Sequence, residues 1–220
     1  MDNGSTILEE QVVRIQQSGV IDEIVIVIGF LAEHIEEKIR MFRTNGMRIK
    51  TIYNPFYNIS NNLISLWLAR HEMDTDFLIT NGDNIFSPDV FTDFVGKNEN
   101  GVYLSVSIKD SYDDDDMKVV IRNNIVAKVS KAIRQEKISA ESPGLALVHG
   151  TKSRELFIEN IETLVKDREN INKFWLEVFN VMSRKGIPIH PWEFDGKTKW
   201  QEIDFHPDLI KVRKLLQLKF

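Results

Sequence analysis

In the first part of the chain, segments whose apolar residues have helical spacing alternate with segments that are unbroken apolar runs. Leu8, Val12 and Ile15 fall on one face of a predicted helix, which residues 18–19 (Ser-Gly) end. Residues 24–28 follow as a run of isoleucine and valine bounded by a glycine. A run of this kind predicts a strand that is covered on both faces, as strands of parallel sheets are.

The same alternation then repeats. Residues 35–42 predict a helix, residues 49–53 a strand and residues 63–70 a second helix, while the short apolar strand 77–80 stops at Asn81-Gly82-Asp83. This order predicts right-handed crossovers and an α/β fold with an open, mixed, mostly parallel sheet and helices on both faces. Ligands gather at the carboxyl ends of the strands in such sheets, and Asp83 follows such an end.

The second half of the chain has a different pattern. Strict alternation over residues 102–108 and a hairpin around Arg122-Asn123-Asn124 predict antiparallel strands that join the same sheet. Further predicted elements are a strand at 144–148, helices at 153–166 and 172–185, a strand at 187–189 and a terminal helix at 209–216.

Composition narrows the possible functions. The 220 residues are 42% hydrophobic and 28% charged, which fits one domain over residues 1–220. The chain has no cysteine, so any metal must bind oxygen or imidazole ligands. A net charge of −5 disfavours nucleic-acid binding. Neither a membrane-spanning run nor a signal peptide is found, so we expect a cytoplasmic protein.

Two carboxylates are candidate metal ligands. Asp83 follows a buried strand and Gly82, and Asp204 precedes the last predicted helix. Brought together, two carboxylates would hold Mg²⁺ and leave coordination positions for water and phosphate oxygens. The alternative is structural: Asp83 would close a turn or cap the helix near Pro88, and Asp204 would cap the helix that opens at Pro207.

Residues 53–62 form an unusual loop of amides and hydroxyls between a strand and a helix. Amides both donate and accept hydrogen bonds, which suits the edge of a nucleobase. The alternative is an ordinary proline-containing turn in which Ser60 or Asn61 caps the helix.

Aromatic and acidic residues offer two further sites. Trp175 and Glu177 could together hold an ammonium group by cation–π and Coulomb attraction, although aromatic residues at helical spacing are more often core. The acidic run 113–116 lacks the spacing and the glycine of a calcium loop, so we interpret it as a solvated loop.

Several of these segments together resemble a known family. Residues 54–70 followed by Asn81-Gly82-Asp83 are similar to nucleotidyltransferases related to choline-phosphate and aminoethylphosphonate cytidylyltransferases. The similarity continues in order through nearly the whole chain, at Met117-Lys118-Val119, Val129-Ser130-Lys131, Glu141 and Glu202-Ile203-Asp204.

The resemblance implies a sugar-nucleotide-transferase-like (GT-A, Rossmann-like) fold and a reaction. CTP would be condensed with a small phosphate or phosphonate, releasing pyrophosphate, with Mg²⁺ as cofactor. Asp83 and Asp204 would bind the metal. The other implied roles are catalysis for Lys118, nucleotide binding for Asn54, Ser60, Asn61 and Asn62, and substrate binding for Lys131 and Glu141. For each lysine, a solvated surface charge remains the alternative.

The chain departs from the family at its start. Family members begin with a strand and a Gly-rich loop that hold the triphosphate, and the resemblance here begins only after that loop. We therefore expect an N-terminally incomplete domain with poor turnover of CTP. Alternatives are a sugar-phosphate nucleotidyltransferase and a catalytically silent nucleotide-binding module; self-association is left open.

Overall fold

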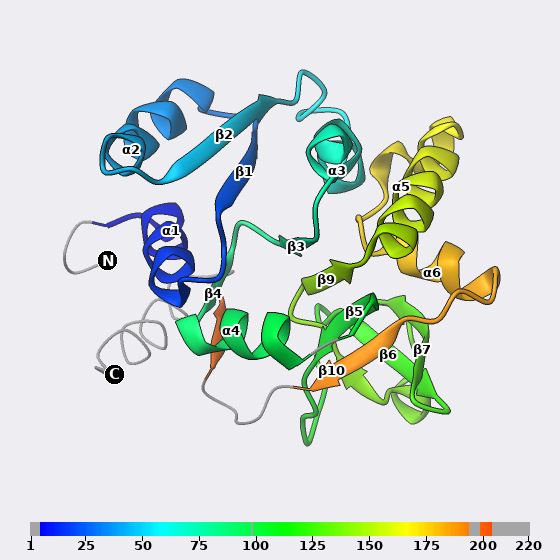
Figure 1. The fold of residues 1–220 in the computed structure, drawn as a ribbon. Helices are drawn as coiled ribbons and strands as arrows, with labels where there is room; N and C mark the ends of the chain where they lie inside the picture. The colour runs from blue at the N-terminus through cyan, green and yellow to red at the C-terminus, as the bar shows by residue number, and fades with distance from the viewer. Residues whose placement is uncertain (1–4, 98, 194–198, 204–220) are drawn as a thin grey trace.

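The computed structural model describes residues 5–97, 99–193 and 199–203 (Figure 1). Helix α1 (Ile7–Ser18) begins at a capping box, in which Thr6 and Glu9 bond each other's backbone N–H groups, and ends at Gly19 in a left-handed conformation. Strands β1 (Glu23–Ile28) and β2 (Arg48–Tyr53) are connected by helix α2 (Ala32–Thr44) and pair directly in parallel. All four predicted elements are therefore confirmed.

The main sheet has the strand order β10-β5-β9-β3. Its strands are β3 (Phe77–Thr80), β5 (Gly101–Val106), β9 (Leu145–His149) and β10 (His190–Glu193). The mixed α/β prediction is confirmed, but among the described strands only the pairs β1-β2 and β10-β5 are parallel, so the prediction of a mostly parallel sheet is wrong. Strand β9 lies antiparallel between β3 and β5, because the chain enters it from the opposite end of the sheet.

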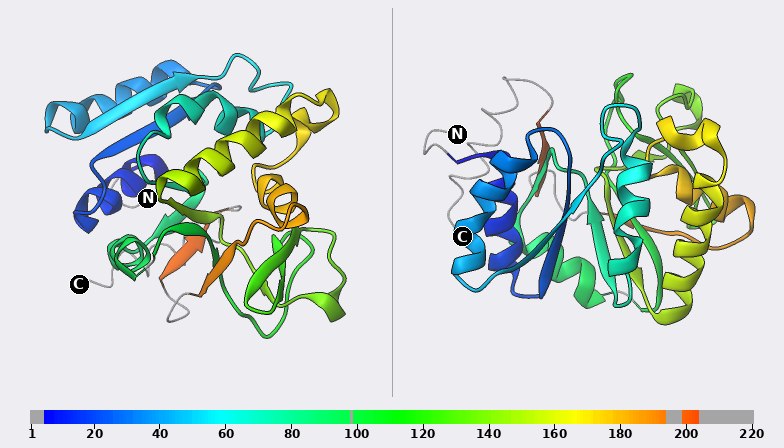
Figure 2. Two further views of the ribbon diagram at one scale, coloured as in Figure 1. Left: turned by 45° about the vertical axis from the view of Figure 1, so that its right-hand side comes forward. Right: turned by 90° about the horizontal axis from the view of Figure 1, so that it is seen from above.

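Helices cover both faces of this sheet, as predicted. On one face Ala146 and Val148 of β9 share a core with helices α3 (Asn62–Leu68), α5 (Thr151–Val165) and α6 (Glu177–Arg184). On the other, Leu145 and Leu147 pack against helix α4 (Pro88–Lys97). Figure 2 shows α1, α2, β1 and β2 on one side of the molecule and α5 and α6 on the opposite side.

Smaller elements complete the fold. The predicted hairpin is confirmed as β6 (Lys118–Arg122) and β7 (Ile125–Ser130), turning at Asn123 and Asn124, both with positive φ. Strand β8 (Ala140–Glu141) extends it, and β4 (Asn84–Phe86) pairs with β11 (Trp200–Glu202). Short 3₁₀ turns span Ala69–Glu72, Gln135–Lys137 and Arg168–Asn172. Among the described residues, no helix is long and apolar enough to cross a bilayer.

Two predicted elements differ from the structure and one cannot be compared. The helix expected over 172–185 begins only at Glu177, because the backbone before it serves another segment: Lys173 accepts from the N–H of Leu63, and Trp175 donates to Asn62. The strand expected at 187–189 begins instead at His190. The predicted terminal helix 209–216 lies outside the described residues.

The prediction that β1 is covered on both faces is wrong. Residues 24–27 are partly exposed, although every one of them is isoleucine or valine. Within the described residues β1 pairs only with β2, and β3 pairs only with β9. Each of these strands therefore has an edge without a neighbouring strand in the described fold, and an edge of that kind is open to further pairing.

This edge predicts unequal protection from hydrogen exchange. Amides of β9, paired on both sides and buried, should exchange slowest, whereas amides of β1 should exchange much faster because local opening breaks a single ladder. Hydrogen exchange measured by mass spectrometry would resolve the two strands. Equal protection of β1 and β9 would contradict the unpaired edge and indicate that β1 gains a second partner strand in solution.

Candidate active site

The pairing of β3 with β9 brings two turns together. Thr80 lies opposite Leu145, so the Asn81-Gly82-Asp83 turn that leaves β3 adjoins the residues that enter β9. The contact is close: a Cβ atom on Gly144 would lie 2.6 Å from Nδ2 of Asn81, and Gly144 has a φ of +72°. Glycine is required here both for the backbone conformation and for the approach of Asn81.

The turn that carries Asp83 is held from two directions. Gln11 of α1 donates to the carbonyl oxygens of Asn81 (2.9 Å) and Asn84 (2.8 Å). The N–H of Ile203 donates to the carbonyl of Asp83 at 3.0 Å. The Asp83 side chain is partly exposed and accepts from Nδ2 of Asn84 at 3.2 Å. These bonds position a carboxylate at the end of a strand.

The structural alternatives for Asp83 can now be separated. Asp83 does not cap α4, because strand β4 lies between them and Ser87 bonds Asp89 at the start of that helix. It does belong to a turn, which leaves its carboxylate at the surface. Asp204, the other predicted metal ligand, lies outside the described residues; the described chain before it ends at Ile203, bonded to Asp83.

Many polar groups of the predicted nucleotide-binding loop, residues 53–62, form hydrogen bonds within the loop or with helix α3. Asn54 is only 2% exposed; its side chain accepts from the N–H of Phe56 and donates to Ser65. Ser60 donates to the carbonyl of Phe56 at 2.7 Å, and Asn61 caps α3 as the structural alternative proposed. These bonds shape the loop, and its outer side presents the exposed ring of Tyr57.

Trp175 connects this loop to the Asp83 turn. Its indole N–H donates to Oδ1 of Asn81 at 2.8 Å, and its backbone N–H donates to Oδ1 of Asn62 at 2.8 Å. The ring is 3% exposed and packs edge-on against Phe179. Trp175 is therefore a core residue, as the structural alternative predicted. Its two N–H groups hold the Asp83 turn and the amide-rich loop in position.

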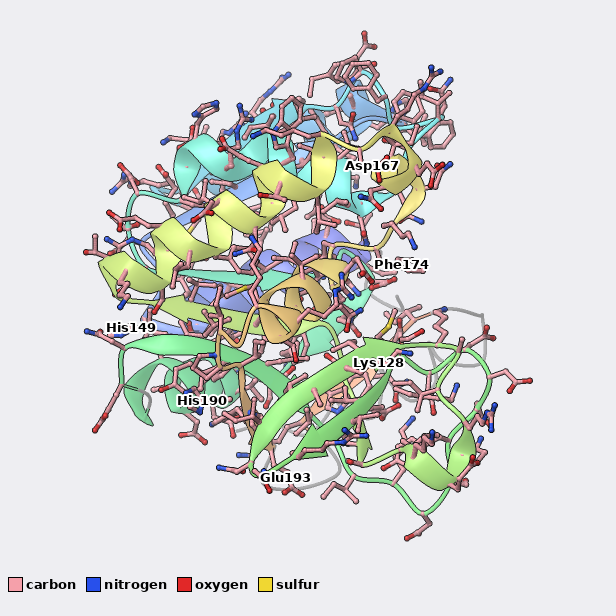
Figure 3. The ribbon with its side chains drawn as sticks, turned by 90° about the vertical axis from the view of Figure 1, so that its right-hand side faces the viewer. Lys128, His149, Asp167, Phe174, His190 and Glu193 are labelled. Carbon is pink, nitrogen blue, oxygen red and sulfur yellow. The ribbon has the colours of Figure 1, made fainter. Side chains whose placement is uncertain are left out.

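Trp175 and Glu177 do not form an aromatic cage. Glu177 accepts from Asn180 (2.8 Å) and Arg184 (3.3 Å), and it lines a separate hollow of about 320 Å³ beside Lys128. The exposed aromatic ring in this segment is Phe174, which lies on the connection before α6, above the hairpin that carries Lys128 (Figure 3).

The two predicted lysines have different surroundings. Lys118 is 1% exposed, and its ammonium donates to three backbone carbonyls, of Asp114 (3.1 Å), Asp116 (3.4 Å) and Lys131 (3.1 Å). The surface-charge alternative is therefore wrong for Lys118. Lys131 is exposed, with its ammonium 5.6 Å from the ring centroid of Phe174. Only Lys131 presents a charge to solvent.

Glu141 lies at the centre of a charged cluster that the sequence did not reveal. Its carboxylate is 3% exposed and lies 2.5 Å from the ammonium of Lys109, which is also 3.3 Å from Asp116. Burial raises the pKa of Glu141 to about 7; Lys109 lowers it and the carboxylate of Asp116 raises it. Asp116, expected in a solvated loop, is instead part of this cluster.

No distinctive spacing marks Lys109 in the sequence. It is five residues from Asp114 and far along the chain from Glu141, and only the loop after β5 brings it to β8. Asn81 was part of the recognised motif, but its role in holding Trp175 could not be inferred from its position.

A metal site is compatible with these residues. Within the described ranges there is no group of three or more histidine, aspartate or glutamate side chains that could hold a metal. The partly exposed carboxylate of Asp83 fits a hard cation that takes few protein ligands and keeps water and substrate oxygens, as Mg²⁺ does.

Comparison with known proteins identifies the fold. The chain is similar to the inositol-1-phosphate CTP transferase of T. maritima, with a TM-score of 0.75 and 20% identity over 95% of this chain and 81% of that one. It also resembles CTP:phosphocholine cytidylyltransferase of Streptococcus pneumoniae, with a TM-score of 0.68, 18% identity and coverage of 98% and 87%. The chain therefore has a nucleotidyltransferase fold.

One relative is closer in sequence over a limited part. A stretch of 70 residues, 32% of this chain, is 37% identical to CMP-5'-(3-aminopropyl)phosphonate synthase of Streptomyces rubellomurinus (strain ATCC 31215). The match covers 11% of that protein, so the chain corresponds to a small part of its length. No protein-family model matches the chain.

The buried carboxyl of Glu141 predicts a pH-dependent stability. Since its pKa is raised from 4.5 to about 7, the folded state holds a proton that the unfolded state has lost, and the free energy of unfolding should fall as pH rises between these values. Glu141→Gln should remove this slope, which amounts to roughly 3 kcal/mol over the full shift at about 1.4 kcal/mol per pKa unit.

Urea unfolding between pH 5 and pH 8 measures this effect. Glu136→Gln, at an exposed position on a neighbouring turn, is the matched control and should keep the slope of the unchanged protein. An identical slope in the Glu141→Gln variant would show that this carboxyl is not the titrating group.

Proposed function

We propose that the protein is a Mg²⁺-dependent nucleotidyltransferase that condenses CTP with a small phosphate or phosphonate. The candidate acceptors are phosphocholine and 2-aminoethylphosphonate, and the products are a CDP- or CMP-linked compound and pyrophosphate. The observation that carries the proposal is the bond between Ile203 and Asp83, because it brings the segment leading to the second predicted carboxylate against the first.

Asp83 and Asp204 are the proposed metal ligands. When bound, Mg²⁺ would neutralise charge on the phosphate oxygens of the nucleotide. The chain's own part is to hold the Asp83 carboxylate in place, which Gln11 and Ile203 do through the backbone of the turn. A ligand fixed by its backbone loses little conformational entropy when the site is filled.

The remaining residues would position two substrates. The loop that contains Asn54, Ser60, Asn61 and Asn62 would lie along the base and ribose, with Asn54 acting through the shape of the loop because it is buried. Lys131, exposed beside Phe174, would meet an anionic group of the acceptor or nucleotide. Lys118 would act indirectly, since its three carbonyl partners tie the acidic loop to the end of β7.

The reaction needs positioning more than proton transfer. An oxygen of the acceptor phosphate or phosphonate attacks the α-phosphorus of CTP, a new P–O bond forms, and the bond to the β-phosphate oxygen breaks to release pyrophosphate. The acceptor oxygen is already ionised near neutral pH, so little general-base assistance is needed. Charge neutralisation and in-line approach are what the site must supply.

A sugar-phosphate or polyol-phosphate acceptor is the second candidate. The observation that favours it is the likeness of the fold to a CTP transferase for inositol-1-phosphate and to a putative glucose-1-phosphate thymidylyltransferase from Bacillus anthracis. Comparing turnover of these phosphates with that of aminoalkyl phosphonates would separate the two candidates.

Pyrophosphate release tests the proposal. The protein in its full encoded length, supplied with CTP, Mg²⁺ and either phosphocholine or 2-aminoethylphosphonate, should release pyrophosphate. Asp83→Asn should reduce kcat/KM by roughly a hundredfold or more, because it removes a charged ligand from the metal. Asp74→Asn, at an exposed position, should have no effect. No release with any acceptor and nucleotide would overturn the proposal.

A further inference from the structure

Trp175 bonds two parts of the candidate site that are distant in the chain, the amide-rich loop 53–62 and the turn 81–84 that carries Asp83. We infer that Trp175 is a positioning residue for the proposed reaction: it couples these two parts, so that a nucleoside bound along the loop also restrains the Asp83 turn. The inference rests on the proposed function and extends it, because it makes the placement of a metal ligand depend on whether the loop is filled.

The two hydrogen bonds of Trp175 fix the orientation of two asparagine side chains. An indole N–H and a backbone N–H can only donate. Asn81 and Asn62 therefore each direct Oδ1 to Trp175, at 2.8 Å in both cases, and turn Nδ2 away from it. Trp175 thus leaves N–H donors of both side chains, rather than their oxygens, for the acceptor atoms of a nucleotide.

The segment that leads to Trp175 is also bonded to the end of the loop. The N–H of Asn61 donates to the carbonyl of Ile171 at 2.8 Å. The N–H of Leu63 donates to the carbonyl of Lys173 at 3.4 Å. Because these bonds lie on either side of the one between Trp175 and Asn62, a displacement of the end of the loop also displaces Trp175.

The Trp175 ring transmits such a displacement because it is closely packed. It is 3% exposed, belongs to the larger core and meets the ring of Phe179 edge-on, with 5.6 Å between the ring centroids. Protein interiors have few voids, so a shift of one buried ring moves the groups that it contacts.

Asn81 is held at its side chain and at its backbone. Trp175 bonds its Oδ1, and Gln11 bonds its carbonyl oxygen at 2.9 Å. Gly144 lies so close that a Cβ atom there would be 2.6 Å from Nδ2 of Asn81. Asp83 follows two residues later with a partly exposed carboxylate. The placement of that carboxylate therefore depends on Trp175, and through Trp175 on the loop.

Hydrogen exchange with a bound nucleoside tests the coupling without catalysis. Cytidine has no phosphate groups and needs no metal, so it should occupy the loop alone. Saturating cytidine should slow the exchange of amides in residues 53–62 severalfold and, through Trp175, also that of amides in residues 81–84. In Trp175→Phe, which keeps an aromatic ring and the backbone N–H, only residues 53–62 should be protected.

Two further variants separate the hydrogen bond from the packing of the ring. Asn81→Leu has a similar shape and removes the same bond from its other end without altering the core, so it should also confine protection to the loop. Phe157→Leu lies in the same core as Trp175 and should lower the melting temperature, yet it should pass protection on to residues 81–84 as the unchanged protein does.

The second test measures the metal requirement of pyrophosphate release. In Trp175→Phe the Mg²⁺ concentration that gives half-maximal release should rise roughly tenfold, which is within the range of couplings between sites. The KM for CTP at saturating Mg²⁺ should change by less than about twofold, because the bond to Asn62 remains. Phe157→Leu should change neither value.

Three results would overturn the inference alone: protection of residues 81–84 that persists in Trp175→Phe or in Asn81→Leu, protection confined to the loop in the unchanged protein, or an unaltered Mg²⁺ requirement in Trp175→Phe. All three are compatible with pyrophosphate release, so the proposed function would stand. Failure of both cytidine and thymidine to protect residues 53–62 would overturn the proposed function and the inference together.

Discussion

The structure depends on β9, a buried strand that is paired on both sides. Its side chains alternate between two cores, with Ala146 and Val148 toward one set of helices and Leu145 and Leu147 toward α4. This alternation permits a single register, since a shift by one residue would exchange the two faces. The register in turn sets Thr80 opposite Leu145, and so brings the Asp83 turn beside the residues that precede β9.

Around that register, buried polar groups connect segments that are distant in the chain. Trp175 donates to Asn81 and Asn62, and thereby connects the turn after β3 to the amide-rich loop. Lys118 does the same for the acidic loop and the end of β7. Buried hydrogen-bond donors need acceptors, so each of these two side chains holds a loop in one conformation.

In the charged cluster of Lys109, Asp116 and Glu141, by contrast, burial is energetically unfavourable. Glu141 is desolvated, its pKa is raised to about 7, and one of its oxygens lacks a donor within the described fold. A fold selected for stability alone would favour an apolar side chain there.

The sequence alone determined the α/β class, the positions of most elements and Asp83 at a strand end, because hydrophobic periodicity and glycine placement are local properties. Tertiary structure decided the antiparallel insertion of β9, the late start of α6, the burial of Lys118 and the meeting of Lys109 with Glu141. Each of these features depends on a hydrogen bond or ion pair between residues that are distant in the chain, such as Trp175 with Asn62. A local sequence pattern does not indicate which acceptor a buried donor will bond.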